Sequence, residues 1–256
     1  MLQIGDTSDK HFMASGRFIP RDEDPVAWIR HLWPEYASRV DEVYGFVPEQ
    51  LRLYGGRPPG LDNGLSDWQL ACLRDHGIGF SLNLTNHYFN DEAYREARQT
   101  LQRLHVDGNS IVCTNNRLAE RLRADFPRFR LKASVLKHLN TKAKLEAALE
   151  LYDRVVVPIF LSDDENFLQS LEPKDRIVPW ATCFCAYNCR EWTCWASTSR
   201  KWMGVSPNGR TEGAIRRCLE RHAAAVPLAF NLDASCFAGY KCFKLAQPSA
   251  RIKRVQ

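Results

Sequence analysis

Short apolar runs rich in β-branched residues alternate with segments of helical periodicity along almost the whole chain. Regular alternation of this kind is typical of parallel strands joined by right-handed crossovers. Eight strands in 256 residues favour an α/β fold, a closed (β/α)₈ TIM-like barrel, over an open doubly wound sheet. The predicted strands are 10–19, 40–46, 78–84, 110–113, 131–135, 154–158, 176–181 and 241–246, and helices are predicted at 91–104, 116–125, 141–152, 165–171 and 211–224.

The barrel is expected to occupy residues 1–256 as a single domain, because no linker or repeat divides the sequence. Its last third is expected to be irregular, with an insertion-like, cysteine-rich segment at about 182–209. No stretch approaches the roughly 18 consecutive apolar residues that cross a bilayer. The N-terminus also lacks the basic and apolar regions of a signal peptide. A cytoplasmic protein without a membrane anchor is therefore expected.

Charge is unevenly distributed between the two parts of the chain. Residues 1–100 hold 10 Lys and Arg against 15 Asp and Glu, whereas residues 101–256 hold 25 against 15. A basic C-terminal part favours an anionic partner, such as a nucleotide, RNA or a carboxylate. A solvated basic surface without a partner explains the same pattern about equally well.

Four of the nine cysteines fall within twelve residues, at Cys183, Cys185, Cys189 and Cys194. Clustered cysteines in a reducing compartment bind metal more often than they form disulfides. All-thiolate ligation suits an iron–sulfur cluster or Zn²⁺. Structural zinc usually uses paired Cys-x-x-Cys knuckles, which this segment lacks, and the Cys-x₃-Cys-x₂-Cys motif of radical-SAM enzymes is broken because Trp192 stands at its third position. Burial as small apolar side chains is the remaining alternative.

The cysteines follow the predicted strand 176–181, and the C-terminal ends of barrel strands are where barrel enzymes place their chemistry. Cys185 and Cys189 are four residues apart, so one helical turn would bring both sulfurs to the same face. Cys194 and the downstream Cys218 are further candidate ligands.

Polar side chains at other strand ends are candidates for substrate contact or proton transfer. Asn83, Asn86 and His87 end or follow the third predicted strand, and Lys244 lies on the last. Ser134 and His138 occupy a similar place at the fifth strand. A lone histidine at such a position is nevertheless more often structural. A loop dense in Gly and Pro, 54–64, is expected to form a wall of the site.

Three stretches together resemble the collagenase-like peptidase family. They are the strand entering the cysteines (176–190), Cys218 with the following 231–234, and the closing strand 239–246. The family resemblance implies a TIM barrel with a [4Fe-4S] cluster, whose better-understood members hydroxylate RNA bases or ubiquinone precursors without O₂. It implies Cys185, Cys189 and Cys218 as ligands with Cys194 as the fourth, and Cys183 competes for any of these places.

The first functional hypothesis is therefore an iron–sulfur enzyme that modifies a nucleic-acid base or nucleotide by O₂-independent hydroxylation. Asn83, Asn86, His87 and Lys244 are then its candidate catalytic residues, with a small organic hydroxyl compound as oxygen donor. The alternative is a non-catalytic accessory or RNA-binding barrel in which the cysteines hold a structural metal such as zinc. A hydrolase or peptidase ranks third, because the sequence shows no motif that pairs a nucleophile with a base.

Overall fold

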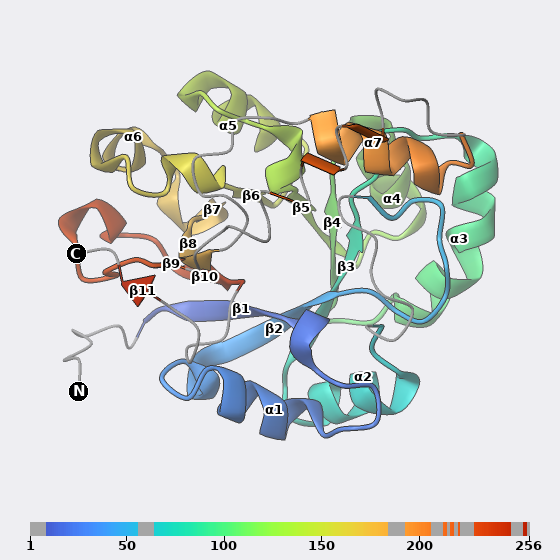
Figure 1. Ribbon diagram of the computed structural model, residues 1–256, viewed down its shortest axis with the longest axis horizontal. Helices are drawn as coiled ribbons and strands as arrows, with labels where there is room; N and C mark the ends of the chain where they lie inside the picture. Colours follow the sequence, from blue (N-terminus) through green and yellow to red (C-terminus); the bar gives the residue numbers. More distant parts are fainter. Residues whose placement is uncertain are drawn as a thin grey trace.

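Parallel strands form a barrel at the centre of the computed structural model (Figure 1). The structure describes residues 9–55, 64–183, 193–205 and 228–246, and short pieces at 212–213, 216–217, 220 and 253–254. The barrel strands are β1 (His11–Ser15), β2 (Val40–Gly45), β3 (Gly79–Leu84), β4 (Ser110–Cys113), β5 (Arg130–Ala133), β6 (Arg154–Val156), β7 (Ile177–Val178), β8 (Trp180–Cys183) and β10 (Cys242–Leu245). All pairings among them are parallel, in the order β8-β10-β1-β2-β3-β4-β5-β6-β7.

The barrel is nearly closed, with a seam between β7 and β8. These two strands follow each other directly on either side of Pro179, so one run of chain supplies both edges of the seam. β7 pairs with β6 and β8 pairs with β10. The Trp180 indole N–H also donates to the carbonyl of Val157 across this junction at 2.8 Å. The predicted TIM-like barrel is confirmed.

Helices lie between successive strands and cover the outside of the barrel (Figure 1). They are α1 (Pro25–Leu32), α2 (Asp67–Asp75), α3 (Asp91–Leu104), α4 (Asn116–Asp125), α5 (Lys142–Ala148), α6 (Glu165–Ser170) and α7 (Thr193–Trp202). Two shorter strands complete the sheet, β9 (Leu228–Ala229), antiparallel to β8, and β11 (Lys253–Arg254). No helix in the described part of the chain is long and apolar enough to cross a membrane.

Helices α1, α2 and α7 were not predicted, although the first two carry clear start signals. Asp24 caps α1 by accepting from two backbone N–H groups, and Pro25 occupies its first turn. Ser66 and Gln69 form a reciprocal capping box at α2. The predicted strand 10–19 was too long, because β1 ends at Ser15 and a 3₁₀ turn follows. Of the predicted helix 211–224, the described positions 212–213, 216–217 and 220 are helical.

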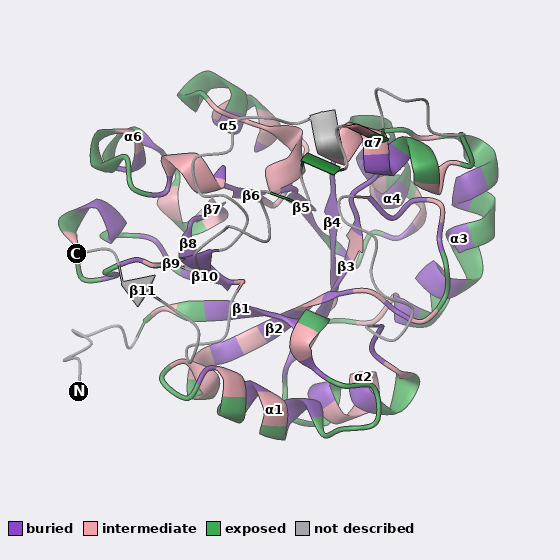
Figure 2. Cartoon of the chain, in the orientation of Figure 1, coloured by how far each residue is buried: buried purple, intermediate pink, exposed green. Residues whose placement is uncertain are grey.

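Burial separates an apolar outer core from a polar barrel interior. The strands are buried, whereas the helices expose their outer faces (Figure 2). Along the strands, outward residues such as Val43, Leu82 and Phe243 pack in the apolar core. The residues that alternate with them include the polar side chains of Glu42, Ser81, Ser110 and Lys132, which hydrogen bonds link to one another, and the side chain of Lys244. The barrel interior therefore contains polar side chains near the C-terminal ends of the strands, where barrel enzymes place their chemistry.

Candidate functional site at the C-terminal side of the barrel

A buried ion pair between β2 and β5 occupies the barrel interior. The Lys132 ammonium donates to the Glu42 carboxylate, and both side chains are almost completely inaccessible to solvent. The Ser110 hydroxyl donates to the same carboxylate, and Ser81 Oγ lies 2.7 Å from Ser110 Oγ. Burial alone would raise the pKa of Glu42, but Lys132 and Ser110 together outweigh it and lower the pKa. Glu42 is therefore an ionised and fully partnered group.

Lys244 is the second buried lysine of the barrel, and its surroundings differ. It precedes the last residue of β10 and is 4% exposed. Its Nζ lies 3.8 Å from the centroid of the Tyr44 ring and 5.4 Å from that of Trp180. No described residue accepts a hydrogen bond from this amine. Burial, reinforced by the nearby charge of Lys132, lowers the pKa of Lys244 to about 7.

Asn83 lies two residues beyond Ser81 on β3 and therefore on the same, inward face of the strand. Its side chain is half-buried and makes no hydrogen bond to another described residue. Its amide is thus available to a ligand at the C-terminal end of the barrel.

Asn86 and His87, by contrast, hold other segments in place. The buried Asn86 amide donates to the carbonyls of Arg52, Tyr54 and Ser199, at 2.7, 3.0 and 3.1 Å. His87 Nδ1 lies 3.0 Å from the Ser199 hydroxyl, and its Nε2 lies 3.1 Å from the carbonyl of Leu136. Burial lowers the pKa of His87, so the ring is neutral near pH 7.

These contacts fix α7 at the C-terminal side of the barrel. Ser199 belongs to α7, and its partners Asn86 and His87 follow β3 directly. The Tyr54 and Trp202 rings make a second contact, edge to face, with their centroids 5.8 Å apart. The beginning of the predicted wall loop also lies here, because a Cβ on Gly55 would be 2.3 Å from the carbonyl oxygen of Thr85. Residues 56–63 of that loop lie outside the described residues.

The candidate metal ligands lie outside the described residues. The structure does not describe Cys185, Cys189 or Cys218, and of Cys194 it describes only the helical backbone at the start of α7. Cys183 ends β8 and is buried. In the ranges that the structure does describe, no three His, Cys, Asp or Glu side chains converge to hold a metal ion. What is fixed is that the cysteine segment connects the end of β8 with the start of α7.

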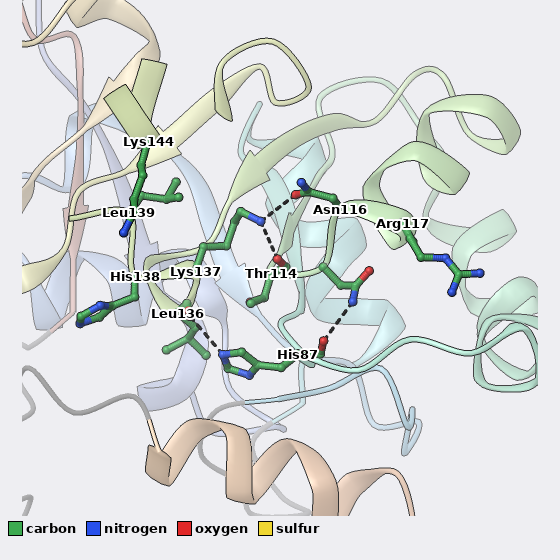
Figure 3. Close-up of a pocket in the computed structure, with 10 residues that line it drawn as sticks. His87, Thr114, Asn116, Arg117, Leu136, Lys137, His138, Leu139 and Lys144 are labelled. Atoms are coloured by element: carbon green, nitrogen blue, oxygen red, sulfur yellow. Dashed lines mark hydrogen bonds between the residues drawn. The ribbon is translucent and has the colours of Figure 1, made fainter. Parts of the chain in front are cut away.

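A basic cavity of about 630 Å³ lies beside these elements, between the loops that follow β4 and β5 (Figure 3). None of its lining residues is acidic. They are His87, Thr114, Asn115, Asn116, Arg117, Leu136, Lys137, His138, Leu139 and Lys144. Ser134 caps the 3₁₀ turn before His138 and is buried, so of these two candidates only His138 lines the cavity.

The sequence did not single out Glu42, Tyr44, Lys132 or Ser199. A signal was present for the first three, because a charged or aromatic-polar residue at every second position of a short strand marks its inward face. Ser199 carried none, since its importance depends on where α7 lies. Asn83 and Lys244 face the barrel interior, whereas Asn86 and His87 join the loops at its C-terminal side.

Fold and site together define a TIM-like α/β barrel with a buried amine inside and a basic cavity at the C-terminal ends of its strands. Among solved structures, the fold is similar to that of the U32 peptidase Mk0906. The likeness has a TM-score of 0.50 and 13% sequence identity, and it covers 78% of this chain and 80% of that one. At this identity it bears on the fold alone. No protein-family model and no curated protein matches the sequence.

Proposed function

We propose that this protein is an iron–sulfur enzyme whose reaction takes place at the C-terminal side of the barrel, with Lys244 exchanging a proton with the substrate. The observation that carries the catalytic part is the Lys244 amine, which lies inside the barrel against two aromatic rings and pairs with no carboxylate of the described residues. A buried ammonium without an anionic partner lowers the stability of the fold. A contribution to stability therefore does not explain the lysine at position 244.

The chemistry of Lys244 follows from its surroundings. With a pKa of about 7, the amine is present in both protonation states near neutral pH, which suits a general acid or base. The Tyr44 ring stabilises the protonated form through its π-face. The unpartnered amide of Asn83 is the proposed substrate-orienting group. Asn86 and His87, the other two predicted catalytic residues, instead hold α7 and the 51–55 segment in place.

The cluster would be held by Cys185, Cys189, Cys194 and Cys218, with Cys183 as the competing ligand. Support comes from the chemistry of this donor set and from the positions of its flanks. Cys183 ends a barrel strand, and α7, which begins at Thr193, is fixed over the loop after β3 by Ser199. When bound, such a cluster supplies electron transfer or a Lewis-acidic iron.

The proposed substrate is a nucleotide or a base within RNA, and the family resemblance extends this to hydroxylation with oxygen from an organic hydroxyl compound. The basic residues of the C-terminal part support an anionic substrate. The alternative that remains is a non-catalytic RNA-binding barrel with structural zinc, for which Lys244 would need no exchangeable proton.

The test is metal analysis of protein purified anaerobically from iron-replete cells. Wild type is expected to be coloured, with iron and sulfide in equal amounts and an EPR signal on reduction. The double variant C185A/C189A should lose the iron while remaining folded. C72A is the matched control, because Cys72 lies on α2 beside Asp24 and should keep the cluster. Colourless wild type, or zinc in place of iron with unfolding of the double variant, would contradict the proposal.

The substrate is tested by mass spectrometry of RNA from cells that contain wild type, K244M or no protein. A modified nucleoside that is present with wild type and absent with K244M supports the proposal. If K244M retains the modification, Lys244 has no catalytic role even when the cluster is present.

A peptidase is the third candidate, and one observation favours it. Ser199 and His87 are hydrogen-bonded at 3.0 Å, as a nucleophile and its base would be. However, Ser199 is completely buried, and its hydroxyl also accepts a hydrogen bond from the backbone N–H of His87. The other ring nitrogen of His87 faces the carbonyl of Leu136 and not a carboxylate. We expect no labelling of Ser199 by a fluorophosphonate probe; labelling that S199A abolishes would favour the peptidase instead.

A further inference from the structure

The cavity between the loops after β4 and β5 contains more cationic groups than its surroundings neutralise. Arg117, Lys137 and Lys144 line it, and none of the three pairs with a carboxylate among the described residues. Other described lysines do so: Lys132 with Glu42 inside the barrel and, on the same helix as Lys144, Lys142 with Glu146. A concave site with positive charge and no acidic lining concentrates anions.

The three cations contribute differently. The Lys137 amine donates to the carbonyl of Thr114 at 2.8 Å and to the side-chain oxygen of Asn116 at 2.7 Å, so neutral groups hold it in place without cancelling its charge (Figure 3). Lys144 donates to Asn140 at 3.0 Å and is exposed. Arg117 stacks on Phe89 and points away from the other lining side chains (Figure 3).

Two polar groups of residues that line the same cavity lack a hydrogen-bond partner among the described residues. The Thr114 hydroxyl is buried without a hydrogen bond, in a side chain that is 6% exposed. Nε2 of His138 is likewise buried and unpartnered, in a residue with left-handed backbone geometry at φ 55°. Buried polar atoms without partners are uncommon and call for an explanation such as a missing ligand.

The first turn of α4 adds donors to this set. Asn115 caps the helix by accepting from Leu118 N–H, and the backbone N–H groups of Asn116 and Arg117 belong to the unpaired first turn. Helix N-termini favour anions, phosphate above all. Ammonium, imidazole, hydroxyl and backbone N–H donors therefore belong to residues that line one cavity, with the His138 ring turned away from Lys137 and Thr114 (Figure 3).

We infer that this cavity is a phosphoryl-binding subsite, which holds the phosphate of a nucleotide or of an RNA strand. A tetrahedral dianion can use several donors at once, and a volume of about 630 Å³ is in the range that small ligands occupy. The inference deepens the proposed function and rests on it for the identity of the substrate, whereas the binding of phosphate needs neither a cluster nor turnover.

The experiment is a titration of full-length protein with inorganic phosphate, followed by amide chemical shifts in NMR. The expected result is saturable shifts at Asn116, Arg117 and His138. K144Q and H138N should each weaken binding about three- to tenfold; asparagine tolerates the left-handed backbone at position 138. K142Q is the matched control, because Lys142 is on the same helix but pairs with Glu146, and it should bind as wild type does.

Two further arms distinguish the source of the phosphate. Tighter binding of a nucleoside monophosphate than of a single-stranded oligonucleotide assigns the subsite to free nucleotides, and the reverse order assigns it to RNA. Shifts that map elsewhere, or equal affinities in K144Q, H138N and K142Q, overturn the inference. Because binding is measured without turnover, failure of this inference can be distinguished from failure of the proposed function, which would appear as a protein that lacks iron.

Discussion

Two lysines lie inside the same barrel and are equally hidden from solvent, yet they have opposite surroundings. Lys132 on β5 donates to the Glu42 carboxylate, which Ser110 also contacts. Lys244 on β10 lies against the rings of Tyr44 and Trp180 and forms no ion pair with a carboxylate in the described part of the chain. The charge of Lys132 is neutralised by Glu42, whereas the Lys244 amine can lose its proton or contact a ligand.

The difference in surroundings gives the two lysines different roles, a structural role for Lys132 and a chemical role for Lys244. An ion pair that is fully hydrogen-bonded is a fixed part of the core, and breaking it leaves a buried charge behind. An amine that is not hydrogen-bonded to a carboxylate can gain or lose its proton without breaking an ion pair. This contrast, rather than burial, is why we assign the proton transfer to Lys244 and the structural role to Lys132.

The largest effect is expected for Glu42→Gln. The change leaves the Lys132 ammonium buried without its carboxylate, so the free energy of unfolding should fall by about 3–5 kcal/mol. Urea denaturation followed by circular dichroism measures it. The double variant E42L/K132M, which removes both charges, should recover most of the loss. A single variant as stable as wild type would show that the pair is not what holds β2 and β5 together.

The pair also predicts how stability depends on pH. Since the folded-state pKa of Glu42 is lowered, its contribution is fully present above the unfolded pKa of about 4.3 and is lost as pH falls through the folded value. The acid limb of the stability curve should therefore be flatter in E42L/K132M than in wild type.

Lys244→Met should act in the opposite direction. Between the folded pKa of about 7 and the unfolded pKa of about 10.4, the unfolded chain binds a proton that the folded chain does not. Wild-type stability therefore rises with pH across this window, and the variant should lose that slope. At pH 7 the variant should be more stable than wild type, by about 4 kcal/mol at most, and inactive.

Urea titrations at pH 7, 8.5 and 10 compare the two proteins, so that other titrating groups cancel. NMR of ¹³C-methylated lysines gives the midpoint directly, with Lys244 titrating near 7. Identical pH slopes in K244M and wild type would remove the contrast between the two lysines.

The sequence was sufficient for the barrel but only partly for its site. Each of the eight predicted strands coincides with part of the barrel because alternation depends on local burial, but the predicted strand 176–181 is two strands, β7 and β8, which separate at Pro179. Lys244 was found since it lies on the last predicted strand. Tyr44 and Trp180, which surround it, come from strands far apart in the chain, and their meeting follows from closure of the barrel. The role of Asn86 depended on α7, a helix that the sequence did not reveal.

Two asparagines near the end of β3 repeat the comparison on a smaller scale. Asn86 donates to three carbonyls from two segments, so Asn86→Ala leaves buried acceptors unpaired and should cost about 2 kcal/mol. Hydrogen exchange should then increase in α7 and around Tyr54. Gln69→Ala, which removes a buried amide on α2 at a distance from α7, is the control: it should lower stability without this local pattern.

The smallest effect on stability, and the sharpest on function, is expected at Asn83. Its amide has no described partner to lose, so Asn83→Ala should change the free energy of unfolding by no more than about 0.5 kcal/mol. If the amide orients the substrate for proton exchange with Lys244, the same variant should lower the rate of RNA modification or weaken substrate binding. A stable variant with wild-type activity would leave Lys244 without this partner. An unstable variant would instead place Asn83 with Asn86 among the residues that hold the barrel's loops.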